Sequence, residues 1–271
     1  MTTQDLTSTV VSRDGTRIAV GRYGSGPPIA LAGGAFTDRR ALGPLAQALA
    51  PYFTVLAYDR RGRGDSSDTQ PYAVAREIED LAAVMAAAGG PACVFGHSSG
   101  AGLAVLAAAG GVAISKLAVY EPPYMVEKGD YLPPADLAGR MTELSASGRR
   151  GEAVEYWMSH TMRPSAEALA QMRVSPMWAG LEAVAHTAAY DAEIMADQER
   201  GDPLPAAWAT QVTMPTLIMD GENSPPWMHR SMDALAALLP DTQRHTFPGA
   251  DHGVAPNALV PVLREFMRPA A

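Results

Sequence analysis

The chain has 271 residues, which is enough for one α/β domain with an insertion or for two small domains. Its 47% hydrophobic and 18% charged residues are typical of a globular protein and exclude a disordered or fibrous chain. The formal net charge of −8 argues against a nucleic-acid partner, because nucleic acids attract clustered Lys and Arg.

Short apolar runs alternate with helical patterns along the first part of the chain. Residues 13–15, Arg-Asp-Gly, lie between two such runs and predict a β-hairpin. The basic cluster at 60–63, Arg-Arg-Gly-Arg, is followed by Asp65 and is interpreted as a solvated loop. This alternation predicts right-handed βαβ crossovers and a mostly parallel sheet with helices on both faces. The expected strands are 9–12, 17–22, 29–32, 55–58, 92–95 and 116–120, and the expected helices are 41–50, 74–88 and one that begins at 99.

The alternation breaks after Tyr120, where Glu-Pro-Pro at 121–123 ends a strand. From residue 136 to about residue 200 the pattern is helical, without a strand of matching length. A segment of roughly 80 residues is too long to be a loop, so we expect a helical lid over the C-terminal edge of the sheet. The pattern then resumes with strands at 216–219 and 243–247 and helices at 227–239 and 255–266.

Three features bear on the compartment. The first residues, Met-Thr-Thr-Gln-Asp, lack the charged and apolar regions of a signal peptide. The longest apolar stretch, 101–113, is rich in Ala and Gly and is too short to cross a bilayer. The single cysteine, Cys93, has no partner for an internal disulfide and is expected to be a small core residue. A cytoplasmic protein without membrane association is predicted.

Residues 96–100, Gly-His-Ser-Ser-Gly, are the most informative segment. An apolar run precedes them and a small-residue helical pattern follows, which predicts a sharp strand-turn-helix junction. Such a turn exposes the hydroxyl of Ser98 above the sheet, and the two glycines leave room for neighbouring backbone. The N-terminus of the following helix directs N–H groups toward negative charge that forms beside Ser98. Ser98 is therefore the candidate nucleophile.

Together with residues 96–100, two further motifs resemble the α/β-hydrolase superfamily. They are Leu-Ala-Gly-Gly-Ala-Phe at 31–36 and Gly-Ala-Asp-His-Gly at 249–253. The loop Asp-Arg-Arg-Gly-Arg-Gly-Asp-Ser at 59–66 is typical of the lid-bearing members. The resemblance covers essentially the whole chain, and its motifs are specific for the fold but only weakly specific for the substrate.

This resemblance implies an α/β-hydrolase fold with a mostly parallel eight-stranded sheet flanked by helices. The core is expected to comprise residues 1–122 and 213–271. A helical lid is expected at 123–212, inserted after the sixth strand.

A serine hydroxyl is a poor nucleophile unless a base within hydrogen-bond reach accepts its proton. His252 lies between the last strand and the last helix, in a loop that opens at the sheet edge where Ser98 is displayed, and it is the expected base. His97 is adjacent to Ser98, but neighbouring side chains on a sharp turn point apart, so His97 is expected to be structural or to line the pocket wall. The other histidines are His160, His186, His229 and His245.

The acid of the triad is displaced from its usual position. In most members of the superfamily it follows the strand at 216–219, where this chain has Ser224. A serine does not carry the charge that stabilises a protonated histidine. Glu121 directly follows the strand at 116–120, the other position from which members of this fold supply the acid, and it keeps the chain order Ser, acid, His. This placement is similar to that in the lactonases that open zearalenone. The alternatives that remain open are Asp220, Glu222 and Asp251.

The resemblance also implies two backbone donors for an oxyanion. One is the N–H of Ser99, the residue after the nucleophile. The other is expected in the loop after the strand at 29–32, where the usual His-Gly-x reads Gly-Gly-Ala. Alignment of the glycines selects Ala35, with Phe36 as the alternative one residue later.

The predicted lid is rich in aromatic and thioether side chains. Most of them are expected to pack the lid's own core. Some must face Ser98, because an insertion at this position roofs the pocket, and such walls suit a flat or flexible apolar substrate. The expected substrate-binding residues are Phe36, Tyr124, Trp157, Met177 and Trp178.

The sequence contains no metal-ligand pair and no phosphate-binding or dinucleotide motif, so neither a metal nor a cofactor is implied. The leading hypothesis is a serine hydrolase that opens an ester or lactone of a moderately large apolar small molecule through an acyl-enzyme. The alternatives are a carbon–carbon bond hydrolase or an acyltransferase that uses the same triad, and a ligand-binding member with weak catalysis.

Overall fold

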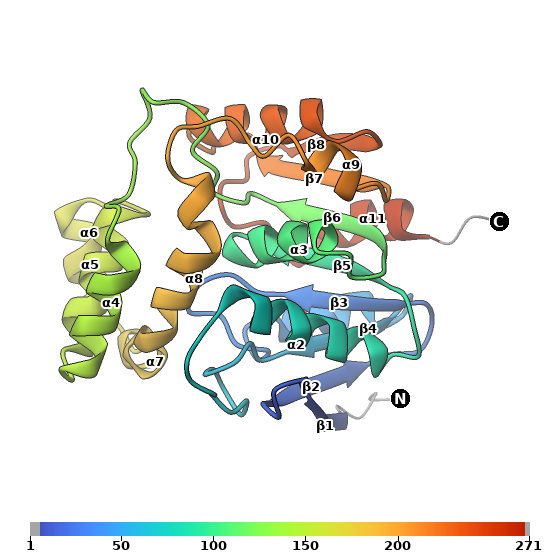
Figure 1. Cartoon of the computed structure of the whole chain (residues 1–271), viewed down its shortest axis with the longest axis horizontal. Coiled ribbons are helices and arrows are strands. Elements are labelled where there is room, and N and C mark those ends of the chain that lie inside the picture. Colours follow the sequence, from blue (N-terminus) through green and yellow to red (C-terminus); the bar gives the residue numbers. More distant parts are fainter. Residues whose placement is uncertain (1–5, 269–271) are drawn as a thin grey trace.

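Eight strands form one mixed sheet in the computed structural model, which describes residues 6–268 (Figure 1). Their order is β1-β2-β4-β3-β5-β6-β7-β8. The β1–β2 and β2–β4 pairs are antiparallel and the other five pairs are parallel, which confirms the mostly parallel eight-stranded sheet. The strands are β1 (Leu6–Val11), β2 (Arg17–Tyr23), β3 (Pro28–Ala32), β4 (Thr54–Tyr58), β5 (Ala92–His97), β6 (Ile114–Tyr120), β7 (Thr216–Gly221) and β8 (Thr242–Phe247).

Helices cover both faces of the sheet (Figure 1). Helices α2 (Val74–Ala86), α3 (Ser99–Ala109) and α10 (Pro226–Leu238) pack on one face, and α1 (Gly43–Leu49) and α11 (Pro256–Met267) on the other. Parallel strands buried on both faces are continuously apolar, and all five residues of β4 are buried. No helix in the described part of the chain is long and apolar enough to span a bilayer.

A helical insertion follows β6, as predicted, and it has a hydrophobic core of its own. Its helix α8 packs against α4 and also contacts α3 close to the start of that helix (Figure 1). The insertion contains α4 (Leu137–Ala146), α5 (Arg150–His160), α6 (Ala166–Arg173), α7 (Trp178–Ala183), α8 (Ala188–Met195), α9 (Trp208–Gln211) and the 3-10 helices Ala185–Thr187 and Ala196–Gln198.

The prediction of a solvated loop at 60–63 is wrong. Arg60, Arg61 and Arg63 are each at most 1% exposed. Each guanidinium is paired with carboxylates from α2, from α8 or from the first hairpin. These partners are distant in sequence, and paired charges are tolerated in an interior where single ones are not. Cys93, in contrast, is 6% exposed and lies in the core as expected.

Candidate active site

Ser98 occupies a strained turn between β5 and α3. Its backbone has φ 56° and ψ −129°, and its N–H donates to the carbonyl of Tyr120 at 2.9 Å. A Cβ atom at Gly96 would lie 2.6 Å from the carbonyl oxygen of Gly100, and one at Gly100 would lie 2.5 Å from that of Gly33. Both glycines are therefore required by the close approach of neighbouring backbone, as the sequence predicted.

Residues with a strained backbone cluster at the carboxyl ends of the central strands. Only four non-glycine residues among the described residues have a positive φ, and three of them are Phe36 (56°), Ser98 (56°) and Glu121 (48°). They follow the neighbouring strands β3, β5 and β6 at their carboxyl ends. Such conformations cost about 1–3 kcal/mol each and persist where the surrounding structure imposes them, most often at functional sites.

The carboxylate of Glu121 and the imidazole of His252 form a partly buried pair. The Nδ1–H of His252 donates to Oε2 of Glu121 at 2.7 Å. The Glu121 side chain is fully buried, whereas that of His252 is 34% exposed. A carboxylate only accepts hydrogen bonds, so this contact places the Nδ1 proton toward Glu121 and leaves Nε2 free to act as a base.

The second oxygen of Glu121 is held by the segment that carries the acid in most superfamily members. Its Oε1 accepts from the N–H of Gly221 at 2.8 Å and from the hydroxyl of Ser224 at 2.5 Å. Burial alone would raise the pKa of Glu121, but the hydrogen bonds from His252, Ser224 and Gly221 outweigh it and lower the pKa below its usual value. Glu121 is therefore ionised at neutral pH.

The three alternative carboxylates lie elsewhere. Asp220 is buried, but it accepts from Nδ1–H of His229 at 2.8 Å, and also from Arg244 and Thr246. Glu222 accepts from the N–H of Gly249, and Asp251 from that of Gly253. None of them is hydrogen-bonded to His252.

His97 ties the His252 loop to the nucleophile turn. Its Nε2–H donates to the carbonyl of His252 at 2.9 Å, and the two rings lie 4.9 Å apart. Burial, followed by the nearby His252 ring, lowers the pKa of His97 to about 4. His97 is therefore neutral at neutral pH, and it holds the backbone of His252 close to the turn that carries Ser98.

The loop after β3 lies against Ser98. A Cβ at Gly34 would be 2.8 Å from Cβ of Ser98 and 3.4 Å from its Oγ. The N–H groups of Ala35 and Ser99 donate to no protein acceptor within residues 6–268. Ser99 begins α3, where a helix leaves its first amides without partners. Both amides therefore keep a hydrogen bond to donate.

The five predicted substrate-binding residues lie in different environments. Phe36 and Trp157 form an edge-to-face pair with ring centroids 5.9 Å apart. Trp178 is half-buried and donates through Nε1 to a glutamate on its own helix. Tyr124 is 1% exposed within the core between the sheet and α3, and Met177 is 64% exposed. These positions do not support substrate contacts by Tyr124 or Met177.

The residues that the sequence analysis missed are Arg60, Arg63 and Asp191. Arg63 donates to the carbonyl of Gly34 at 2.6 Å, and Asp191 accepts from the hydroxyl of Ser99 at 2.7 Å. A compact run of arginines after a buried strand of an acidic protein was the available signal, but their partner in α8 lies more than a hundred residues away in sequence.

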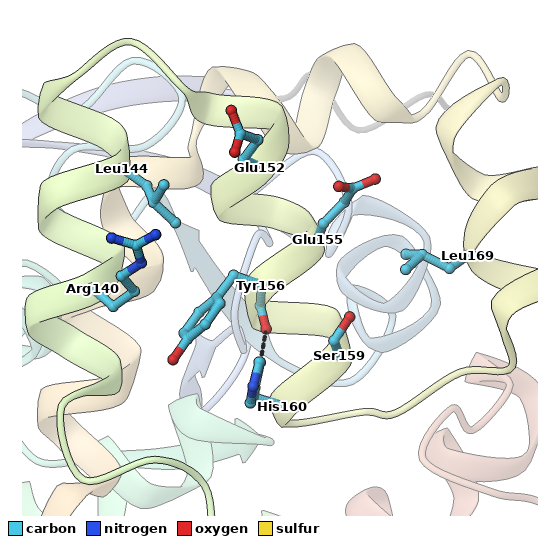
Figure 2. Close-up of a pocket in the computed structure, with 8 residues that line it drawn as sticks. All are labelled: Arg140, Leu144, Glu152, Glu155, Tyr156, Ser159, His160 and Leu169. Atoms are coloured by element: carbon cyan, nitrogen blue, oxygen red, sulfur yellow. Dashed lines mark hydrogen bonds between the residues drawn. The ribbon is translucent and has the colours of Figure 1, made fainter.

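A separate hollow of about 320 Å³ lies within the insertion, between α4, α5 and α6. Nδ1–H of His160 donates a hydrogen bond to the carbonyl of Tyr156 at 2.8 Å, drawn as the dashed line in Figure 2. No residue of the Ser98 site lines this hollow. The hollow is lined by Arg140, Leu144, Glu152, Glu155, Tyr156, Ser159, His160 and Leu169.

Among residues 6–268 no group of three or more His, Cys, Asp or Glu is placed to hold a metal ion.

Comparison with known proteins agrees with the fold. The model of the alpha/beta hydrolase family matches residues 27–262. A crystal structure of an alpha/beta hydrolase from Sphaerobacter thermophilus is 51% identical, has a TM-score of 0.90 and covers 96% of this chain and 100% of that one. A 2-(acetamidomethylene)succinate hydrolase from Mesorhizobium japonicum is 31% identical over 256 residues, with 88% of each chain covered. An enol-lactonase from Burkholderia xenovorans shares the fold at 20% identity and a TM-score of 0.70, with 96% of this chain and 99% of that one covered.

Proposed function

Because the chain belongs to the alpha/beta hydrolase family, we propose that it is a serine hydrolase that cleaves an ester or lactone of a moderately large apolar small molecule. The observation that carries this proposal is the 2.7 Å hydrogen bond between Glu121 and Nδ1 of His252. That bond orients an imidazole at the sheet edge where the strained turn displays Ser98.

In the acylation step, Nε2 of His252 accepts the proton of Ser98 while Oγ attacks the substrate carbonyl. The carbonyl oxygen becomes an oxyanion and receives hydrogen bonds from the N–H groups of Ala35 and Ser99. Glu121 remains ionised and stabilises the imidazolium that forms. When the C–O bond to the leaving alkoxide breaks, His252 returns the proton to that oxygen and an acyl-enzyme remains.

Deacylation repeats these events with water as the nucleophile. His252 accepts a proton from water, the hydroxide adds to the acyl carbon, and the proton passes to Oγ of Ser98 as the acid product leaves. In a lactone, the alcohol and the acid are parts of one molecule.

We propose that residues 1–122 and 213–271 form the hydrolase core and that 123–212 act as a lid. The preference for an apolar substrate is supported by the Phe36–Trp157 pair, because Phe36 belongs to the strained loop beside Ser98 and Trp157 to the core of the insertion. Aromatic walls of this kind bind apolar acyl or alcohol groups.

The test is a panel of p-nitrophenyl esters and lactones assayed with the wild-type protein and with Ser98→Ala. We expect turnover that Ser98→Ala abolishes, together with covalent labelling of Ser98 by a fluorophosphonate. Turnover that survives in Ser98→Ala excludes this mechanism, and the absence of both labelling and turnover would support a binding protein.

A second candidate is hydrolysis of an amide bond in a small carboxylic acid. It is favoured by the 31% identity to the 2-(acetamidomethylene)succinate hydrolase. The same acyl-enzyme steps apply, with the proton from His252 delivered to a leaving nitrogen. Inclusion of N-acyl substrates with and without carboxylates in the panel separates the two candidates.

A further inference from the structure

Asp191 is a fully buried carboxylate that α8 brings to the start of α3. Its Oδ1 accepts from the hydroxyl of Ser99 at 2.7 Å and from Nη1 of Arg60 at 2.6 Å. Its Oδ2 accepts from Nη2 of Arg63 at 2.5 Å. The carboxylate therefore joins the insertion to the residue directly after Ser98.

The same two arginines reach the loop after β3. Nη1 of Arg63 donates to the carbonyl of Gly34 at 2.6 Å, and Nη1 of Arg60 donates to that of Gly33 at 3.3 Å. Both guanidiniums are thus shared between Asp191 and the backbone of this loop. Removal of the carboxylate would leave Arg63 without its carboxylate partner and Arg60 with Glu77 alone.

The carbonyl of Gly34 and the N–H of Ala35 belong to one peptide unit. In a trans peptide these two groups are coplanar and point in opposite directions. The hydrogen bond from Arg63 to the carbonyl therefore fixes the direction in which the Ala35 N–H points. On the other side of the site, the hydrogen bond that the Ser99 hydroxyl donates to Asp191 holds the side chain of Ser99, whose own N–H is the second proposed oxyanion donor.

We propose that Asp191 is a positioning residue that aligns both oxyanion donors, so that the hydrolase is competent only when α8 is seated on α3. The proposal rests on the proposed serine hydrolase mechanism. It assigns the insertion a part in transition-state stabilisation in addition to roofing the substrate. Preorganised donors act only when their direction is fixed before charge develops, and this network supplies that constraint.

Packing supports a rigid connection between α8 and α3. A Cβ at Gly102 in α3 would lie 2.5 Å from Sδ of Met195 in α8, so the Met195 side chain packs directly on the surface that this glycine leaves open. Charge balance supports it as well. Glu77 pairs with Nε and Nη2 of Arg60 at 2.6 and 2.8 Å, which leaves Nη1 for Asp191. Two arginines and two carboxylates therefore neutralise one another in a dry interior.

The chain contains a matched control for this network. Arg61 and Asp80 form a buried bidentate pair at 2.8 Å for both bonds, and Asp80 is 1% exposed. Neither residue is bonded to the loop after β3 or to the start of α3. Asp80→Asn removes a buried carboxylate from an arginine without touching the oxyanion donors.

The experiment compares Asp191→Asn, Ser99→Ala and Asp80→Asn with wild type in kcat, KM, fluorophosphonate labelling rate and urea midpoint. We expect Asp191→Asn to lower kcat and labelling by about 10²-fold, with KM changed less than about threefold. Both Asn variants should lower the urea midpoint, and by similar amounts, because each removes a buried carboxylate from an arginine. Asp80→Asn should nevertheless leave kcat within about threefold of wild type. Equal kcat values for the two Asn variants would overturn the proposal.

Ser99→Ala keeps both arginine–carboxylate pairs and serves if Asp191→Asn does not fold. We expect about a tenfold loss of kcat from it, because one of the two donors loses its constraint. An unchanged kcat in Ser99→Ala would overturn the role assigned to Asp191. Ser98→Ala is measured in parallel. If wild-type turnover does not depend on Ser98, the proposed function fails and this inference fails with it. If turnover does depend on Ser98, a negative result with the other variants refutes the inference alone.

Discussion

Replacement of Glu121 by glutamine preserves the shape of the side chain and removes its charge. The N–H of Gly221 is a fixed donor toward Oε1, so the carbonyl oxygen of the glutamine must face it. The amide nitrogen then faces Nδ1 of His252 and donates to it. A neutral imidazole that accepts at Nδ1 carries its proton on Nε2, and in that tautomer it does not accept a proton from Ser98.

The size of the effect follows from the tautomer and the lost charge together. An inverted tautomer at a serine–histidine triad lowers kcat by about 10⁴-fold. This corresponds to about 5.5 kcal/mol of transition-state stabilisation at about 1.4 kcal/mol for each factor of ten. KM should change little, because Glu121 is fully buried and does not contact the substrate.

Asp220→Asn is the matched control for Glu121→Gln. Asp220 lies near the carboxyl end of β7, is fully buried and accepts from a histidine Nδ1, that of His229, at 2.8 Å. Both variants should unfold at lower urea concentration, since each breaks a buried charged network. Only Glu121→Gln should lose kcat, measured on the best ester of the panel. A wild-type kcat for Glu121→Gln, or a 10⁴-fold loss for Asp220→Asn, would refute the assignment of the acid.

Three further predictions follow from the site. Ser224→Ala removes a hydrogen bond that lowers the pKa of Glu121. The ionised carboxylate contributes stability at neutral pH that is lost as pH falls through its folded pKa, so thermal melts across pH 3 to 7 should show this loss at a higher pH in Ser224→Ala than in wild type. His97 has a folded pKa of about 4 against about 6.5 when unfolded, so between these values the unfolded chain binds one more proton than the folded protein. In urea titrations, the stability of the wild type should therefore fall more steeply than that of His97→Gln as pH is lowered through this range. Gly34→Ala places a Cβ 2.8 Å from that of Ser98, so fluorophosphonate labelling should slow by about 10²-fold while circular dichroism at 222 nm stays as in wild type.

The fold could be predicted because its signals are local. Alternating apolar runs and helical patterns gave the order of the strands along the chain, and a helical stretch without strands marked the insertion after β6. Strand limits differed by a few residues, as for β1, which begins at Leu6 although 9–12 was predicted. Hydrogen bonding to β2 sets that limit, and hydropathy does not report it.

The site could be predicted only in part. Motif positions predicted a triad of Ser98, His252 and Glu121, and the structure brings the last two into hydrogen-bond contact. It was not possible to predict from sequence that 60–63 is buried. A charged run is buried only when carboxylates from elsewhere in the chain pair with it, and the sequence does not show which carboxylates lie next to it in space. The same limit applies to Tyr124, whose aromatic side chain suits a core and a pocket equally well, so that composition does not distinguish them.

The displaced acid and the serine at position 224 are parts of one arrangement. An aspartate in place of Ser224 would set a second carboxylate where a hydroxyl now donates to Oε1 of Glu121. Two carboxylates at hydrogen-bond distance repel each other, and one of them would take up a proton at a raised pKa. With serine there, the loop after β7 instead supplies two donors, the hydroxyl of Ser224 and the N–H of Gly221, to an acid that projects from β6. The positive φ of Glu121 directs its side chain toward this loop, so the strain at Glu121 and the serine at position 224 are two requirements of one ionised carboxylate beside His252.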